Sequence, residues 1–179
     1  MRARSPFRRA VQVPASVLAA APLEKGEKVL AATETGGGWW LIGTRDALLI
    51  QPAPSADGAP TRVPWQRVER ADWDRDEELL KVAEVGEFGE VRPEYAFTID
   101  DPGLLLQLIR ERVTASVVLQ RHVRVEGRKG LFVIARRAPH GDSEITWAYE
   151  FDQGIDPAEP AVMAAAQRGL AAAAEELGL

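Results

Sequence analysis

The sequence predicts an α+β protein that is mainly β. Residues 27–99 contain a series of short runs rich in β-branched and aromatic side chains with period-two alternation. A single long amphipathic helix signal follows at residues 100–120. The apolar face of that helix needs a surface to cover, and the preceding strands are the candidates for it.

Residues 1–24 are expected to form an N-terminal arm with a short helix at about residues 15–21. The opening is basic and then modestly apolar, which is the outline of a secretion signal. However, Gln12 and Pro14 interrupt the apolar part, and the Arg8 and Arg9 pair lacks the surroundings of a twin-arginine signal. We therefore interpret this segment as an arm.

The first strands are predicted as a meander. Residues 27–35 and 39–44 flank a triplet of glycines and predict a hairpin, and residues 47–52 add a third strand after a turn at Arg45 and Asp46. Side chains alternate along a strand, so one of the adjacent Trp39 and Trp40 faces away from the core. That outward tryptophan is a candidate contact for the C-terminal extension or for a partner.

A Pro-, Gly- and Ser-rich loop at residues 51–61 separates this meander from the next extended stretch, residues 62–74. Pro64 places that stretch at a sheet edge or at a bend. Residues 78–85 and 94–99 predict two more strands, which brings the expected total before the helix to six or seven. Trp65 is expected in the core.

The order of these segments resembles the pleckstrin-homology-like (PH-like) architecture, especially bacterial PH-like and GRAM-like modules. The likeness covers residues 25–120 and rests on the order of strands and on the spacing from G-T-R-D at residues 43–46 to V-P-W at residues 63–65. It implies a barrel of two antiparallel sheets closed by a helix. The whole chain is also similar to proteins of GC-rich bacteria, a likeness that supplies no activity.

Residues 121–179 exceed what a PH-like barrel needs, and we expect a β-hairpin or meander followed by a C-terminal helix. Residues 122–130, 131–139 and 145–151 predict the strands, and Asp156 with Pro157 predicts the start of the helix. These strands are too apolar for a free tail. We therefore expect the extension to dock on the barrel or on a second copy of the chain, with Trp147 buried against it.

Composition narrows the function classes. The 179 residues contain no cysteine, which excludes disulfides and thiolate metal sites and favours a cytoplasmic location. A net charge of -5 argues against nucleic-acid binding by the whole surface. No apolar run is long enough for a transmembrane segment.

We find no motif for catalysis, for a cofactor or for a metal. The acidic turn with Asp72, Asp74 and Asp76 copies the opening of an EF-hand loop, but Glu77 stands where that loop needs glycine. It is interpreted as a solvated turn at a sheet edge. His122 and His140 lack partners at metal or triad spacing. The chain is therefore predicted not to be an enzyme.

A basic band over residues 110–137 is the strongest sequence signal for an anionic ligand. An alternative interpretation is that it only neutralises the acidic blocks at 66–90 and 140–179. The candidate contacts are Arg121, Arg124, Arg128, Lys129, Arg136 and Arg137.

The leading hypothesis from the sequence is a non-catalytic cytoplasmic interaction module of PH-like type, with a protein as its partner. The alternative is peripheral binding of an anionic surface, either membrane lipid or RNA, through the basic band. A small enzyme with an unrecognised site is a weaker third hypothesis. A homodimer through the C-terminal extension is a further expectation.

Overall fold

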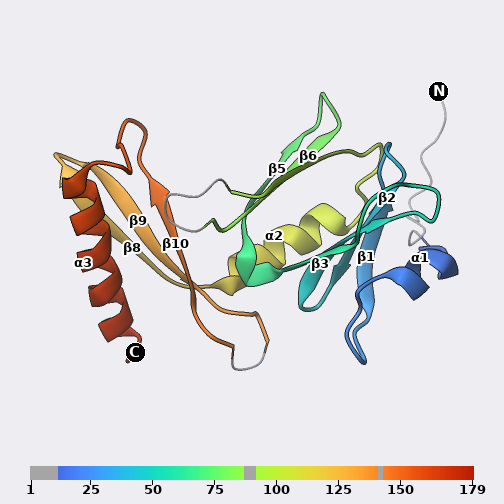
Figure 1. The fold of residues 1–179 in the computed structure, drawn as a ribbon, viewed down its shortest axis with the longest axis horizontal. Coiled ribbons are helices and arrows are strands. Elements are labelled where there is room, and N and C mark those ends of the chain that lie inside the picture. The colour runs from blue at the N-terminus through green and yellow to red at the C-terminus, as the bar shows by residue number, and fades with distance from the viewer. Residues whose placement is uncertain (1–11, 87–91, 141–142) are drawn as a thin grey trace.

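The computed structural model describes residues 12–86, 92–140 and 143–179. Within these ranges the chain is mixed α+β and mainly β, with three antiparallel sheets and three α-helices. Figure 1 shows an elongated molecule: two sheets with α1 and α2 occupy one part, and the third sheet with α3 forms the opposite end. The predicted α+β class is confirmed.

The first sheet is a meander with the strand order β1-β2-β3-β4. Its strands are β1 (Val29–Glu34), β2 (Trp39–Thr44), β3 (Ala47–Pro52) and β4 (Thr61–Pro64). Gly38 closes the turn between β1 and β2 with a φ of +73°, a left-handed conformation that glycine adopts without steric cost. The predicted hairpin at the glycine triplet and the third strand after it are confirmed.

The second sheet has the order β5-β6-β7. Its strands are β5 (Val68–Asp74), β6 (Leu79–Glu84) and β7 (Glu94–Thr98). A 3₁₀ turn, η1 (Trp65–Arg67), follows Pro64 and divides the extended stretch at the residue where an edge position or a bend was predicted. Both sheets are open, so the described strands form no hydrogen-bonded closed barrel. The Gly36 amide, in the turn between β1 and β2, donates a backbone hydrogen bond to the Thr98 carbonyl of β7 at 2.9 Å and so links the two sheets.

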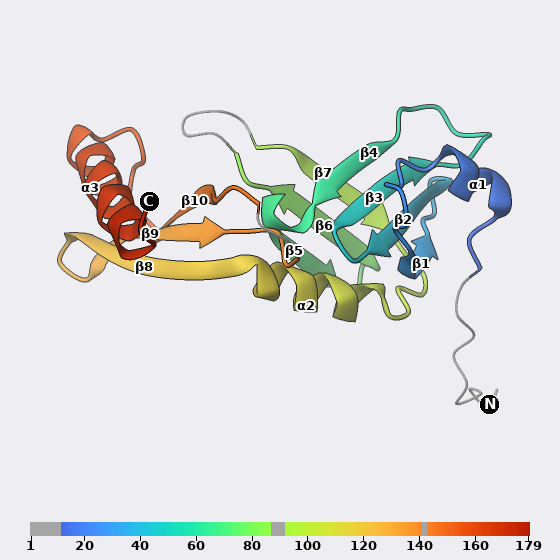
Figure 2. The ribbon, with the colours of Figure 1, turned by 90° about the horizontal axis from the view of Figure 1, so that it is seen from below.

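The two sheets and α2 (Leu105–Ser116) share one hydrophobic core. Its largest fully buried side chain is Trp65, and α2 contributes Leu105, Leu108 and Ile109. The helix lies close to β2 at Gly43, where an added Cβ would lie 2.5 Å from Leu108 Cδ2. Figure 2 shows α2 beside the strands and running directly into β8.

This helix is shorter than the expected 100–120. Asp101 Oδ1 accepts the Gly103 amide at 2.9 Å, and Gly103 has a φ of +53°, so the chain turns before the helix begins. At the other end, Val117 pairs with Arg136 and begins a strand. The β-branched Val117 and Val118 favour that strand once a partner strand is present.

The third sheet has the order β10-β9-β8 and carries α3 on one face. Its elements are β8 (Val117–Glu126), β9 (Lys129–Arg136), β10 (Thr146–Phe151) and α3 (Pro160–Glu176). Pro160, rather than Pro157, is the first helical residue, because Asp156 Oδ1 accepts the Ala158 amide at 2.9 Å and forms a turn there. The expected domain boundary at residue 120 falls within β8.

α3 packs on β8 and β9 through small side chains. Val162, Ala165, Ala166 and Ala173 are buried against Leu131 and Val133 of β9. Gly169 allows the closest approach: a Cβ there would lie 2.5 Å from Val123 Cγ2. The C-terminal sheet and α3 therefore have a core of their own.

α1 (Ala15–Ala20) covers the outer face of the first sheet. Val17 and Trp40 are buried together there, whereas the neighbouring Trp39 packs on the core between the sheets. The outward tryptophan was a candidate contact for the C-terminal extension or for a partner, but the structure buries Trp40 against α1. The N-terminal helix covers it instead, and the rest of the arm, residues 1–11, lies outside the described residues.

The expectation that Trp147 is buried against the first part of the molecule is also wrong. Trp147 is partly buried in the C-terminal core, on the face that α3 covers. The opposite face makes the junction, where Ile134 and Ala148 pack with Val85. The physical reason is the strand period: Trp147 and Ala148 point to opposite sides of β10. The extension docks, but through the other face.

Candidate functional site

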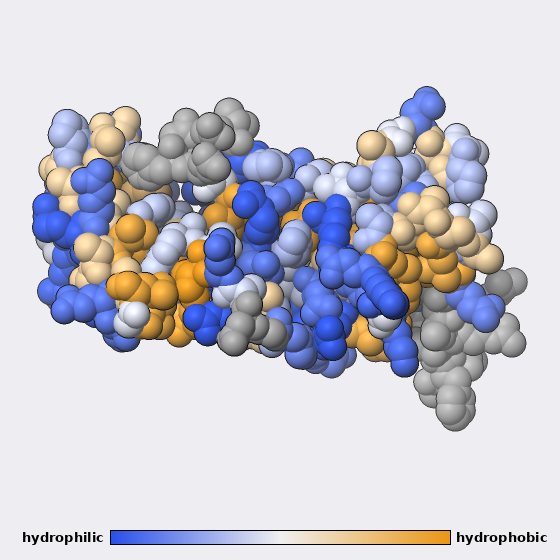
Figure 3. All heavy atoms as spheres, turned by 60° about the horizontal axis from the view of Figure 1, so that its bottom comes forward, coloured by the Kyte–Doolittle hydropathy of each residue, from blue (hydrophilic) through white to orange (hydrophobic). Residues whose placement is uncertain are grey.

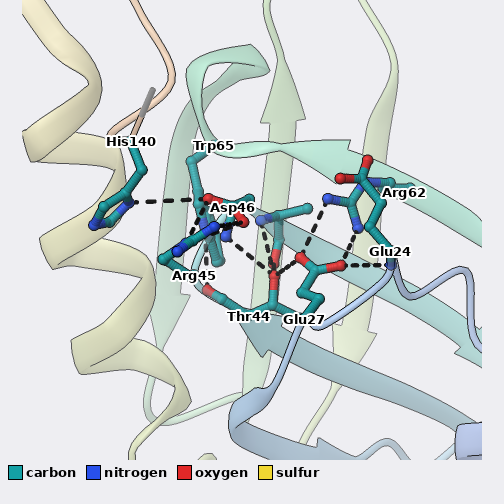
Figure 4. Close-up of polar contacts among 9 residues, drawn as sticks. Glu24, Glu27, Thr44, Arg45, Asp46, Arg62, Trp65 and His140 are labelled. Atoms are coloured by element: carbon teal, nitrogen blue, oxygen red, sulfur yellow. Dashed lines mark hydrogen bonds and ion pairs between the residues drawn. The ribbon is translucent and has the colours of Figure 1, made fainter. Parts of the chain in front are cut away.

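The two motifs that carry the PH-like resemblance contact each other. The Trp65 indole Nε1–H donates to the Thr44 carbonyl at 3.1 Å, and the Trp65 amide donates to the Asp46 carbonyl at 3.2 Å. The Thr44 hydroxyl accepts the amides of Asp46 and Ala47, which closes the turn between β2 and β3. Figure 4 shows these residues gathered around Thr44. This contact fixes η1 against the first sheet.

A buried ion pair supports the same turn. Glu27 accepts hydrogen bonds from Arg62, at 2.7 Å to Arg62 Nη1, and from the Thr44 hydroxyl. Its side chain is only 2% exposed. Burial by itself raises the pKa of Glu27, but the hydrogen bonds from Arg62 and Thr44 outweigh burial and hold that pKa below its usual value. The group therefore stays ionised and ties the chain before β1 to β4.

This network is a structural one. Trp65 and Thr44 have no exposed surface, so a substrate cannot reach their hydrogen bonds. Among the described residues, no group of three or more His, Asp and Glu side chains is arranged to hold a metal ion. In the same part of the chain, no helix combines the length and the apolar character needed to cross a membrane.

The acidic turn between β5 and β6 is organised by its own backbone. Asp74 Oδ1 accepts the amides of Asp76 and Glu77 at 2.9 and 3.1 Å. Asp72 pairs with Arg70 at 3.4 Å on the exposed face of β5. The carboxylates thus serve an Asx-type turn and a surface ion pair, which is the arrangement expected of a solvated hairpin turn.

The six predicted anion contacts do not form one surface. Arg136 is 5% exposed and donates to Ser116 Oγ at 3.0 Å and to the Glu69 carbonyl at 3.0 Å, so it joins the two parts of the molecule. Burial lowers the pKa of this guanidinium. Arg121 pairs with Glu176 of α3. Arg137 is only partly exposed, and its Nε is buried.

The other three predicted contacts surround the tip of the β8–β9 hairpin. Arg124, Arg128 and Lys129 are exposed, and Lys129 donates to the Gln153 carbonyl at 3.0 Å. Nearby, His122 Nε2 lies 3.0 Å from Asp152 Oδ2, and hydrogen bonds from His122 and the Gly130 amide hold the pKa of Asp152 below its usual value. The basic band is therefore reduced to a small cluster at one end of the molecule.

A groove between β5 and α2 is a candidate site that the sequence analysis did not identify. It has a volume of about 350 Å³ and runs along the outer edge of the second sheet, because β5 is the last strand in that sheet. Leu80 and Ile109 form its buried floor. Its full lining is Ala71, Asp72, Trp73, Leu80, Leu106, Ile109, Arg110, Val113 and Thr114.

The groove has an apolar interior and a polar rim. Trp73, Leu106 and Val113 are partly buried and pack against the core, whereas Asp72 and Arg110 are exposed. Figure 3 shows, on the face that it presents, hydrophobic areas interrupted by hydrophilic residues. The sequence signal was present in the alternation of Ala71 and Trp73 with aspartates, but only the fold places this strand beside α2.

Comparisons with family profiles, with curated proteins and with solved structures find no match.

Proposed function

We propose that this chain is a non-catalytic interaction module of PH-like type, which binds an extended peptide segment of a partner protein in the groove between β5 and α2. The PH-like part of the proposal is supported by a four-stranded and a three-stranded antiparallel sheet that share one core and precede α2. A cytoplasmic location belongs to the proposal and is supported by the absence of cysteine.

The observation that carries the peptide-binding function is the position of β5 at a sheet edge beside an apolar groove. An edge strand offers backbone donors and acceptors to an added strand, and alternate side chains of that strand enter the neighbouring groove. The guanidinium of Arg136 already donates a hydrogen bond to the Glu69 carbonyl near the start of β5, so that carbonyl is not free to pair with a peptide. A bound peptide would therefore add along Ala71–Asp74, where the groove lies.

The rim would set the orientation of the peptide. Asp72 lies on β5 and Arg110 lies on α2, so opposite charges face the two sides of a bound segment. We expect a preference for a peptide with one apolar anchor over Leu80 and Ile109 and with flanking charges of both signs.

A peptide-display selection on the full chain tests this function. Peptides that it recovers should lose binding to Thr114→Trp, because the new indole fills a groove that Thr114 lines. Glu111→Trp is the matched control, since Glu111 is exposed on the same helix but does not line the groove. Recovered peptides that bind both variants equally would contradict the groove as the site.

A second candidate function is attachment to an anionic surface through Arg124, Arg128 and Lys129. Among the described residues, none of these three has an acidic side chain within 4.0 Å. Sedimentation with phosphatidylserine vesicles should then decrease with added salt and be lost in Arg124→Gln combined with Arg128→Gln. Vesicle binding that is unchanged in that double variant would reject this candidate.

A further inference from the structure

A second hollow, of about 400 Å³, lies on the other side of α2 from the peptide groove. It is bounded by the segment before β1, by the turn between β2 and β3, by α2 and by the chain after β9. Its lining residues are Gly26, Glu27, Lys28, Leu30, Arg45, Asp46, Arg112 and His140. Figure 4 shows His140 facing Asp46, with Arg45 beside them.

Positive charge exceeds negative charge in this hollow. Glu27 is already neutralised by Arg62, which stands behind it at 2.7 Å. Asp46 is bound by Arg45 at 3.1 Å and lies 3.9 Å from His140 Nδ1. Within the described ranges, neither Lys28 nor Arg112 has an acidic side chain within 4.0 Å.

Arg112 supplies an uncompensated cation to the hollow from α2. It lines the space and is partly exposed. Its Nε atom is buried, so a ligand would reach this side chain through the terminal nitrogens of the guanidinium. An oxyanion in the hollow would accept hydrogen bonds from those nitrogens and would balance the charge of Lys28.

The hollow also offers an apolar contact. Leu30 lines the space and keeps 47% of its surface exposed, so its side chain is accessible to a ligand. An anion that also carries a small apolar group would cover Leu30 while its charged end meets the cations. Inorganic phosphate would meet the cations but would leave Leu30 uncovered.

We propose that this hollow binds a small organic oxyanion, a carboxylate or a phosphate ester with an apolar substituent, through Arg112, Lys28 and Leu30. The site is separate from the proposed peptide groove. Arg110 lines the groove and Arg112 lines the hollow, and residues two positions apart lie on nearly opposite sides of a helix.

The test is a titration of the ¹⁵N-labelled full chain followed by NMR at constant ionic strength. The probes are benzoate, phenyl phosphate and inorganic phosphate, with sodium chloride as the reference. The proposal expects saturable shifts of the Lys28, Leu30 and Arg112 signals with benzoate or phenyl phosphate, and weaker binding of inorganic phosphate. The better of the two organic probes then identifies the charged group of the ligand class.

Arg112→Gln should weaken binding of the better probe about tenfold or more, which corresponds to the loss of one charge-assisted contact. Arg110→Gln removes the same charge from the same helix and should leave binding unchanged. Leu30→Glu tests the site without altering Arg112, since it adds a negative charge at the apolar wall and should abolish binding. The proposal is overturned if no organic probe gives saturable shifts, or if Arg110→Gln weakens binding as much as Arg112→Gln.

Discussion

The two hydrophobic cores of this protein are built from side chains of different size. The core between the first two sheets and α2 contains Trp65 with many fully buried Leu, Ile and Val side chains. The core under α3 receives Ala165, Ala166 and Ala173 from the helix, and Gly169 brings that helix close to the sheet. Large side chains stabilise a core through the apolar area that they bury, whereas small side chains stabilise it by allowing a helix and a sheet to pack closely.

This difference predicts that the two cores respond in opposite ways to changes in side-chain size. In the first core, removing atoms leaves a cavity, because the sheets hold the surrounding side chains in place. In the second core, adding atoms separates α3 from β8 and β9.

Trp65→Ala should lower the free energy of unfolding by about 3 to 5 kcal/mol, because it empties the centre of the first core and removes the hydrogen bond to the Thr44 carbonyl. Urea denaturation followed by circular dichroism measures the change. Trp73→Ala, at a partly exposed position on β5, is the control and should cost clearly less. A loss below about 1 kcal/mol for Trp65→Ala would contradict its central position.

Arg136→Met should cost roughly 2 to 4 kcal/mol, because it leaves Ser116 Oγ and the Glu69 carbonyl without a donor at the junction of the two parts. We also expect the C-terminal part to unfold in a separate, earlier transition. Arg124→Met changes an exposed arginine on the adjacent strand and should be nearly neutral. A single transition with wild-type stability would show that the junction does not depend on Arg136.

Gly169→Leu should destabilise the protein by about 1 to 3 kcal/mol, since its side chain would collide with Val123 and Val133. Ala171→Leu places the same side chain on the exposed side of α3 and should change stability by less than about 0.5 kcal/mol. Hydrogen exchange should show faster opening of α3 in the first variant only. Equal stability of the two variants would mean that α3 does not rely on close approach.

Replacing Glu27 should have the smallest effect on the free energy of unfolding, about 1 kcal/mol. Its pKa is lower in the folded protein than in the unfolded chain, so its contribution is present above the unfolded pKa and is lost as pH falls through the folded pKa. Glu27→Gln should therefore be less stable than the wild type at pH 7, and the difference should shrink below about pH 4. A difference that does not depend on pH would indicate a packing effect alone.

The sequence by itself determined the features that depend on neighbouring residues. The hairpin at Gly38, the turn closed by Thr44 and the strands from Trp39 to Pro52 follow from turn chemistry and period-two alternation, which act over a few residues. It also determined that one helix would cover the strands and that Trp65 would be central. Glycine at position 43 gave no such signal, although α2 packs directly on it.

Only the tertiary structure decided which faces meet. The residues after Ser116 could extend a helix or form a strand, and pairing with β9 settled the choice. The outward tryptophan of the Trp39 and Trp40 pair was a candidate contact for the C-terminal extension or a partner, and Trp147 was expected against the barrel or a second copy of the chain. Instead α1 packs on Trp40, and Trp147 lies in the core under α3. Tertiary structure also decided the sites. Arg136 was expected at the surface but lies in the junction between the two parts. The groove beside β5 exists because the fold places α2 along that strand. Periodicity specifies that a face is apolar or charged, and the packing of the whole chain specifies what it contacts.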